Sequence, residues 1–156
     1  MSTETRLENG NLIVTRVYAA PRELVFEAWV ETSKVQQWWG CAQCTNVRSE
    51  IEPRVGGQYN HHMTIQGAEI PGLATLVEYD PPNRLAYESS LPHDENANMR
   101  VTVDFLETKD GTKVQLVHSG IPDIKVDGDM ELRVIVREGW TAAFGKLDTF
   151  LHSELM

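Results

Sequence analysis

Residues 129–154, DMELRVIVREGWTAAFGKLDTFLHSE, decide the fold, because their apolar side chains recur at three- and four-residue steps. This spacing places those side chains on one stripe of an α-helix. The stripe consists of Leu132, Ile135, Val136, Trp140, Ala143, Phe144, Leu147, Phe150 and Leu151. At about 1.5 Å per residue, the helix is roughly 35–40 Å long. It can bury this stripe only against another large apolar surface, which the preceding residues must supply.

The residues before this helix read mainly as strands that alternate apolar and polar side chains. Two short helices interrupt them, one beginning at Pro21 and one over residues 33–38. Gly56-Gly57 and Asp110-Gly111 are typical of hairpin turns of two residues. The resulting order, β-α-α-β-β-β-β-β-β-α, predicts an α+β fold in which about seven antiparallel strands wrap around the last helix. The strands are expected over residues 12–19, 47–54, 58–66, 72–79, 84–91, 98–107 and 112–119.

The alternation also predicts which side chains face the interior, because successive residues of a strand point to opposite faces. Two histidines fall in otherwise apolar inward rows, His61 in one strand and His118 in another, whereas His62 points the other way. The inner surface is therefore largely apolar with a few polar groups inserted. The inward rows are Tyr59, His61, Met63 and Ile65; Met99, Val101, Val103 and Phe105; and Val114, Leu116 and His118.

Composition and charge restrict the class of protein. The chain has 156 residues, 41% of them hydrophobic, which suits one globular domain over residues 1–156 with a flexible stretch at 1–10. Its formal net charge of −9 disfavours nucleic acids and anionic membranes as partners. No apolar run approaches the ~20 residues of a membrane span. The polar start, MSTETRLENG, has no signal-peptide core, so a cytoplasmic location is expected.

The chain resembles the START-like, birch-pollen-allergen (SRPBCC) superfamily of helix-grip proteins, and within it the group named after the C-terminal domain of the activator of heat-shock protein 90 ATPase. The most telling elements are the AP-x-x-x-V-F-x-A-W helix, the R-x-GG turn and the D-PP-x-R-L turn. The matching segments span nearly the whole chain. They are VTRVYAAPRELVFEAWVETSKVQQWWG, EIEPRVGGQYNHHM, GLATLVEYDPPNRLAYE, VTVDFLETKDGTKVQLVHSG and REGWTAAFGKLDTFL.

The resemblance implies a cavity between a curved sheet and the long C-terminal helix, in a superfamily of lipid carriers, hormone receptors and polyketide cyclases. It carries no universal catalytic set. It does not carry over co-chaperone activity either, because the eukaryotic activators also use a second, N-terminal domain. Cys41 departs from the family pattern, which often has proline at that position.

The main expectation is that the chain binds a small apolar molecule, such as a lipid, polyketide or aromatic compound, in this cavity. Two alternatives stay open: a cyclase, isomerase or hydrolase that uses the same cavity, and a partner-binding module that regulates a chaperone. A homodimer also stays open. The residues expected to contact the ligand are Trp38, Trp39, Tyr59, His61, Met63, Tyr87, Val101, Val103, His118, Trp140 and Phe144.

Several of these residues also have a purely structural interpretation. His61 and His118 can act as a general acid and base, since imidazole titrates near neutrality, or can be hydrogen-bonded parts of the core. Trp38 and Trp39 end the second short helix, where one of them can lie at a cavity entrance and the other can pack inward. Cys41 and Cys44 form a C-x-x-C without two further zinc ligands in a matching spacing. No metal and no cofactor is therefore expected.

Overall fold

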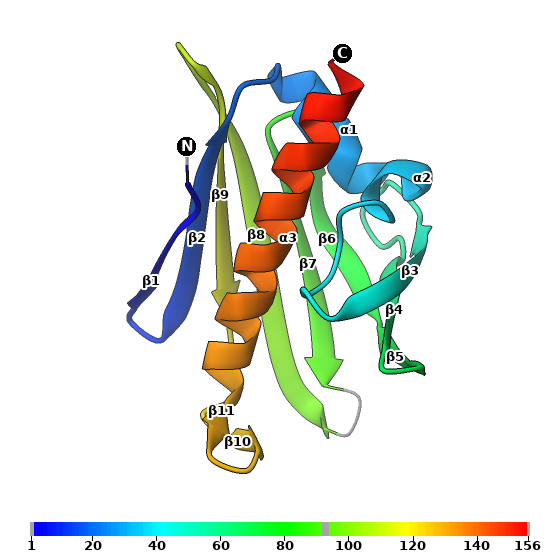
Figure 1. Ribbon diagram of the computed structural model, residues 1–156, viewed down its shortest axis with the longest axis vertical. Coiled ribbons are helices and arrows are strands. Elements are labelled where there is room, and N and C mark those ends of the chain that lie inside the picture. Colours follow the sequence, from blue (N-terminus) through cyan, green and yellow to red (C-terminus); the bar gives the residue numbers. More distant parts are fainter. Residues whose placement is uncertain (1, 92–93, 156) are drawn as a thin grey trace.

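The computed structural model describes residues 2–91 and 94–155. In Figure 1, the long helix α3 lies across the concave face of a large sheet, and α1 and α2 lie at one end of the molecule. The helices are α1 (Arg22–Val30), α2 (Thr32–Val35) and α3 (Leu132–Glu154). The strands are β1 (Glu4–Glu8), β2 (Asn11–Tyr18), β3 (Cys44–Ile51), β4 (Tyr59–Ile65), β5 (Ala68–Gly72), β6 (Ala74–Asp80), β7 (Arg84–Leu91), β8 (Asp94–Thr108), β9 (Gly111–Ser119), β10 (Lys125–Asp127) and β11 (Met130–Glu131).

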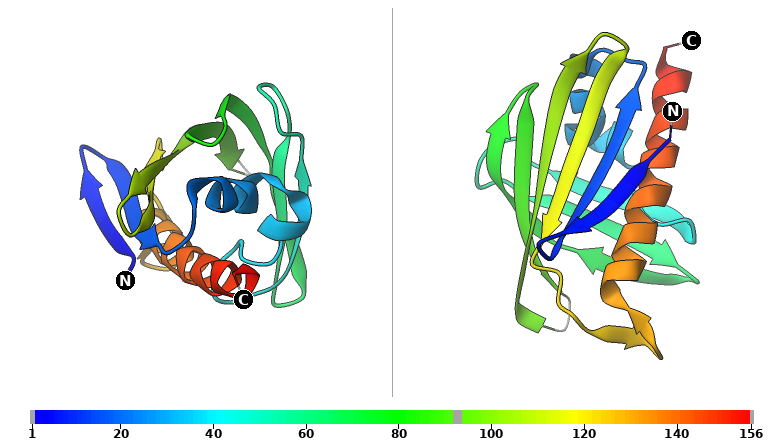
Figure 2. Two further views of the ribbon diagram at one scale, coloured as in Figure 1. Left: turned by 90° about the horizontal axis from the view of Figure 1, so that it is seen from above. Right: turned by 90° about the vertical axis from the view of Figure 1, so that its left-hand side faces the viewer.

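The strands form two main antiparallel sheets and one small hairpin. The larger sheet has the order β1-β2-β9-β8-β7-β6, the smaller has the order β3-β4-β5, and β10 pairs with β11 just before α3. Figure 2 (left) shows the two main sheets curving around α1, with α3 across the open side. This arrangement is the expected helix-grip fold: an α+β domain in which antiparallel sheet wraps around a long C-terminal helix.

The register of the larger sheet aligns a row of inward side chains across five strands. His118 on β9 pairs with Leu12 on one side and with Val101 on the other. Val101 pairs in turn with Tyr87, and Tyr87 with Leu76. All five side chains are buried, and they include Val101 and His118, which the alternation predicted to face inward. The polar His118 therefore lies between two apolar neighbours on the inner face.

Helix α3 packs on this inner face through most of its predicted stripe. Phe144 and Leu147 are fully buried, and the hydroxyl of Tyr18 donates a hydrogen bond of 2.9 Å to the carbonyl of Phe144. Two positions are exceptions: Val136 is partly buried, and Ile135 has 37% of its surface exposed. Seven side chains of the helix are buried: Leu132, Trp140, Ala143, Phe144, Leu147, Phe150 and Leu151.

The structure differs from the sequence-based expectation in local detail. Residues 1–10, expected to be flexible, include β1, which pairs with β2 from Glu4↔Thr15 to Glu8↔Asn11 and so satisfies backbone hydrogen bonds. Gly56-Gly57 does not form a two-residue turn, because residues 52–58 form a longer loop that hydrogen-bonds to Leu76 of β6. The expected strand over 72–79 corresponds to β6, and β5 precedes it as an additional strand. The total exceeds seven because the short strands lack a periodic pattern.

Candidate functional site

An apolar groove lies along one side of α3, between that helix, β4 and the loop that follows α2. We call it the α3 groove; its volume is about 280 Å³. Among the described residues that line it, none carries a charge. The lining residues are Trp39, Gly40, Cys41, Met63, Ile65, Ile135, Val136, Gly139, Trp140 and Ala143.

The loop wall of the groove depends on Gly40, which has a φ of +97°. Residues other than glycine rarely adopt this backbone conformation. A Cβ atom at Gly40 would also lie 3.1 Å from the Sγ of Cys44 and 3.3 Å from the Sδ of Met63. The loop is tied to α3 by Lys146, whose ammonium donates hydrogen bonds to the carbonyls of Trp39 (2.8 Å) and Cys41 (3.4 Å). Backbone conformation and one lysine thus hold the wall in place.

The helix wall of the groove contains Gly139, in the middle of α3. A glycine within a helix costs about 1 kcal/mol relative to alanine, so its position calls for a reason. Apart from its two chain neighbours and the backbone of the helix itself, no atom of the described residues lies within 4 Å of the place where a Cβ of Gly139 would stand. The missing side chain therefore leaves open space on the groove side of the helix.

Two indole rings, those of Trp39 and Trp140, form the aromatic part of the lining. Their ring centroids are 5.3 Å apart and their planes meet at 81°, an edge-to-face contact. Each indole contacts a buried histidine. Trp39 stacks on His61, with centroids 3.8 Å apart and planes at 17°, and the Nε1 of Trp140 donates a 3.0 Å hydrogen bond to the Nδ1 of His118.

His61 has a polar contact with Ser49 of β3, and Ser49 is in turn hydrogen-bonded to Gln36 at the end of α2. The Nδ1 of His61 lies 2.8 Å from the Oγ of Ser49, and the backbone N–H of Ser49 donates to the side-chain carbonyl of Gln36 at 2.8 Å. Burial, with a smaller contribution from His62, lowers the pKa of His61 to about 3. Its Nε2 is buried and has no hydrogen-bond partner among the described residues.

His118, on β9 of the larger sheet, is also buried. Burial lowers the pKa of His118 to about 4, so the ring is neutral near pH 7. Its Nε2 is also buried and without a protein partner in the described part of the chain. The site therefore holds two neutral imidazoles behind two indoles, and each imidazole has one unused nitrogen.

Two tyrosines extend the aromatic contacts of His61 into the interior. The ring of Tyr59 contacts His61 and Tyr87, with centroid distances of 4.6 and 4.8 Å. The hydroxyl of Tyr59 donates to the carbonyl of Trp29 at 2.8 Å. Burial raises the pKa of both Tyr59 and Tyr87, so both phenols keep their protons at neutral pH.

The structure thus separates the expected ligand contacts into three sets. Trp39, Met63 and Trp140 line the α3 groove. His61 and His118 contact these two indoles from the interior, and Tyr59 contacts both His61 and Tyr87. The remaining four lie in the core, where the Nε1 of Trp38 donates to the carbonyl of Ala28 at 2.9 Å. These four residues are Trp38, Val101, Val103 and Phe144.

Seven lining residues were not among the expected contacts. Four of them lie on faces that the periodicity assigned to the interior, namely Ile65 and three positions of the helix stripe, and were only counted as core. Gly40, Cys41 and Gly139 carry no apolar periodicity, although a glycine inside a helix is itself a signal. The missed residues are Gly40, Cys41, Ile65, Ile135, Val136, Gly139 and Ala143.

The cysteines belong to the same loop but form no metal site in the described residues. Cys41 and Cys44 are free thiols, and the backbone N–H of Cys44 donates to the carbonyl of Cys41 at 3.2 Å. Across residues 2–91 and 94–155, no group of three or more His, Cys, Asp or Glu side chains is placed to hold a metal ion.

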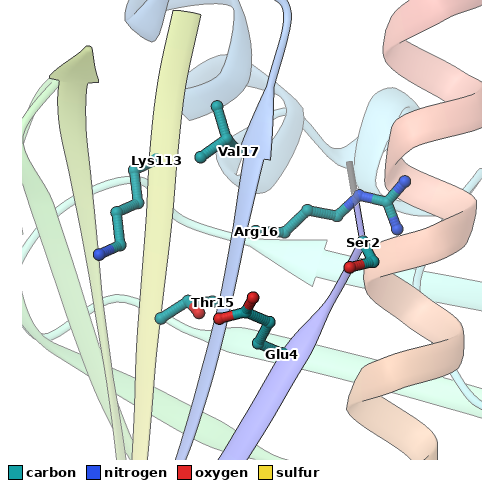
Figure 3. A pocket seen from close by; sticks show the side chains of 6 residues that line it. All are labelled: Ser2, Glu4, Thr15, Arg16, Val17 and Lys113. Atoms are coloured by element: carbon teal, nitrogen blue, oxygen red, sulfur yellow. The ribbon is translucent and has the colours of Figure 1, made fainter. Parts of the chain in front are cut away.

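A second depression, on the outer side of β1, β2 and β9, has a volume of about 390 Å³. Figure 3 shows that its two cations diverge: Arg16 extends toward α3 and Lys113 extends the opposite way. Arg16 is also paired with Asp148 at 3.3 Å. Because the cations do not converge and Glu4 lies between them, this depression suits neither an anion nor an apolar molecule.

Comparison with known proteins identifies the fold and a family model. The model described as "Activator of Hsp90 ATPase homolog 1-like protein" matches residues 19–152. No curated protein matches the chain. Within the described residues, no helix is long and apolar enough to cross a membrane.

Solved structures of bacterial proteins share the whole fold. A protein from Rhodobacter sphaeroides superposes with a TM-score of 0.79 at 18% identity, covering 98% of this chain and 99% of that one. A protein from Arthrobacter aurescens gives 0.78 at 18% identity, covering 98% and 92%. A protein from Chromobacterium violaceum gives 0.77 at 21% identity, covering 89% and 95%. At these identities the likeness concerns the fold alone.

Proposed function

The chain belongs to the family of Activator of Hsp90 ATPase homolog 1-like proteins, and on this premise we propose that it binds a small apolar molecule in the α3 groove. The observation that carries the proposal is the uncharged lining of that groove, with two indoles, two β-strand side chains and one face of a helix around about 280 Å³. Ligand pockets are typically concave and mostly apolar with few polar groups. Binding energy would come from buried apolar area, at about 25 cal/mol per Å².

The gap at Gly139 supports the same proposal. A helix that served only to cover the sheet would gain stability from a side chain there, since most other residues favour a helix over glycine. A glycine instead lets a flat ligand approach the helix backbone beside Trp140. The groove is somewhat smaller than the sites that enclose drug-sized molecules, so a ligand of two or three rings fits its size.

A binding role agrees better with the two histidines than acid–base catalysis does. An efficient general base has a pKa near the working pH. Burial lowers the pKa of His61 to about 3 and that of His118 to about 4, so both are weak bases. Neutral rings of this kind are suited to donating or accepting a hydrogen bond without moving a proton.

Filling the groove at one glycine tests the proposal. Gly139→Leu places a side chain in the open space, whereas Gly145→Leu changes the other glycine of α3, which also has open space around it but does not line the groove. The probe is 2-isopropenylnaphthalene, followed through the indole N–H signals of Trp39 and Trp140 by NMR. We expect Gly139→Leu to abolish binding and Gly145→Leu to retain it. Equal binding by both variants would overturn the proposal.

A second candidate function, contact with a protein partner such as a chaperone, rests on an exposed apolar surface that borders the α3 groove and shares Ile135 with it. Four large apolar side chains next to the start of α3 are between 37% and 46% exposed. Surfaces of this kind are common at sites of protein association. The test is whether the purified chain raises the ATPase rate of Hsp90 from the same organism and whether Val126→Glu removes the effect. An unchanged rate at every concentration would set this candidate aside. The four exposed apolar side chains of this surface are those of Ile124, Val126, Met130 and Ile135.

A further inference from the structure

Cys41 and Cys44 lie at the two ends of a tight turn in the loop after α2. The backbone N–H of Cys44 donates to the carbonyl of Cys41 at 3.2 Å, so residues 41–44 form a hydrogen-bonded turn. A turn of this kind holds its first and last Cα atoms less than about 7 Å apart. Disulfides join cysteines whose Cα atoms are about 4.4–6.8 Å apart. The backbone therefore already holds the two cysteines at about the spacing that a disulfide bridges.

The two thiols differ in their surroundings. Both are free and only partly buried, as is typical of reactive cysteines. Cys41 is one of the residues that line the open α3 groove. The Sγ of Cys44 instead donates to the carbonyl of Asn46 at 3.2 Å and packs beside Gly40, where a Cβ atom would stand 3.1 Å from it. Cys41 is therefore open to a molecule from solvent, whereas the sulfur of Cys44 is held against the loop.

The ammonium of Lys146 lies beside this turn and donates to the carbonyl of Cys41 at 3.4 Å. Burial lowers the pKa of Lys146, and the charges of Cys44 and Cys41 oppose that shift, so the ammonium is close to both sulfurs. Both sulfurs thus lie on the side of the turn that faces α3. A cation attracts a thiolate that forms next to it, and the thiolate is the form of cysteine that attacks a disulfide.

We infer that Cys41 and Cys44 form a thiol–disulfide exchange site that reacts with small aliphatic disulfides such as oxidised glutathione. Cys41 attacks the small disulfide first, because it lines the open groove. Cys44 then attacks the mixed disulfide on Cys41, because the turn holds it within reach. This reaction is separate from the proposed binding of an apolar molecule and does not depend on it.

The two steps balance in atoms and electrons. In the first, the thiolate of Cys41 bonds to one sulfur of the small disulfide, the S–S bond of that molecule breaks, and one small thiol leaves. In the second, the thiolate of Cys44 bonds to the Sγ of Cys41, the mixed S–S bond breaks, and the second small thiol leaves. The protons of the two cysteines end on the two released thiols. The protein pair is oxidised and the small disulfide is reduced.

The folded chain should favour this disulfide more than the unfolded chain does. In the unfolded chain the two cysteines must first be brought together, which costs conformational entropy. In the folded chain the hydrogen-bonded turn has already met that cost. By the same thermodynamic cycle, a disulfide that the fold favours must stabilise the fold. The oxidised protein should therefore unfold at a higher urea concentration than the reduced protein.

Mass spectrometry of the intact chain tests the exchange reaction. The reduced protein is incubated with oxidised glutathione, the reaction is quenched with acid, and the remaining thiols are labelled with N-ethylmaleimide. We expect the wild-type protein to lose both labels together, without a lasting glutathione adduct. Cys44→Ser should keep one glutathione on Cys41, because the resolving thiol is missing. Cys41→Ser should form its adduct severalfold more slowly, because Cys44 is the more protected thiol.

Urea denaturation of the two redox forms gives a measurement that needs no variant. The midpoint of the oxidised wild-type protein should lie above that of the reduced protein, and the double variant Cys41→Ser/Cys44→Ser should not respond to the oxidant. A wild-type protein that keeps both labels, or that ends as a glutathione adduct, would overturn the inference. A lower midpoint for the oxidised form would also overturn it, since the folded turn would then oppose the bond. Each of these outcomes leaves the proposed function standing.

Discussion

The indole of Trp39 lies flat on the imidazole of His61, with ring centroids 3.8 Å apart and planes at 17°. The two residues come from different parts of the fold, one from the loop after α2 and the other from β4. The stack buries His61 and places the opposite side of the indole beside the α3 groove. This single contact thus helps to keep His61 buried and neutral, and it also positions a lining residue of the proposed binding site.

The buried stripe of α3 should dominate the stability of the domain. Phe144→Ala and Leu147→Ala remove fully buried side chains and leave cavities, so each should lower the free energy of unfolding by about 2–5 kcal/mol. Urea denaturation measures this change. Leu155→Ala, at a position with 53% exposure, is the control and should change stability by less than about 0.5 kcal/mol. Small effects at both core positions would show that the helix packs differently.

Two glycines of the groove should respond in opposite directions to alanine. Gly139→Ala adds a Cβ in open space within a helix and should raise the free energy of unfolding by about 0.5–1 kcal/mol. Gly40→Ala meets the Cys44 sulfur and a positive φ, so it should lower that free energy by about 1 kcal/mol or more. Thermal unfolding of the two variants compares them directly. A loss of stability in Gly139→Ala would mean that the space at that position is filled.

Stability should fall on acidification below pH 6.5, where histidines of the unfolded chain begin to take up protons. The pKa values of His61 and His118 in the folded protein are about 3 and about 4, so between pH 6.5 and about 4 only the unfolded state binds these protons. Their contribution to stability is therefore complete above pH 6.5 and is lost as the pH falls, by about 3 kcal/mol for the pair between pH 7 and 5.

Urea titrations at several pH values measure this loss. His61→Phe and His118→Phe should each reduce the slope of stability against pH, whereas Leu155→Ala, at an exposed and non-titrating position, should leave it unchanged. An identical slope in all four proteins would refute the assignment of buried, neutral imidazoles.

The ammonium of Lys146 should hold the loop wall of the groove. Lys146→Met keeps most of the aliphatic stem but removes the hydrogen bonds to the carbonyls of Trp39 and Cys41, so the loop should exchange its amide protons faster. Binding of 2-isopropenylnaphthalene should weaken severalfold. Lys109→Met, on the exposed turn between β8 and β9, is the matched control and should alter neither property. Unchanged exchange in Lys146→Met would mean that the loop is held by its own packing.

The two adjacent tryptophans should report differently on a bound ligand. With 5-fluorotryptophan incorporated, ¹⁹F NMR should show the largest shifts for Trp39 and Trp140, which line the groove, and smaller ones for Trp38, whose ring is buried behind them. Single Trp→Phe variants assign the four signals. If the signal of Trp38 or Trp29 moved most, the ligand would have to occupy the core rather than the groove.

The sequence by itself determined the architecture. The three- and four-residue steps over residues 129–154 and the alternation over 98–107 and 112–119 follow from the geometry of helices and strands, so they predict α3, β8 and β9 and their buried faces. It also predicted that His61 and His118 face the interior, because each continues an apolar row.

Only the tertiary structure decided which side chains meet. Trp38 and Trp39 are adjacent in sequence but make different contacts. Trp38 donates a hydrogen bond to the carbonyl of Ala28, whereas Trp39 stacks on His61. The groove and the Trp140–His118 hydrogen bond likewise depend on contacts between segments that are far apart in the sequence. Local periodicity describes which face of an element is apolar, but it contains no information on which residue of another element will lie opposite. That choice is made when the sheets close around α1 and α3, and it sets the protonation of His118 and the shape of the groove.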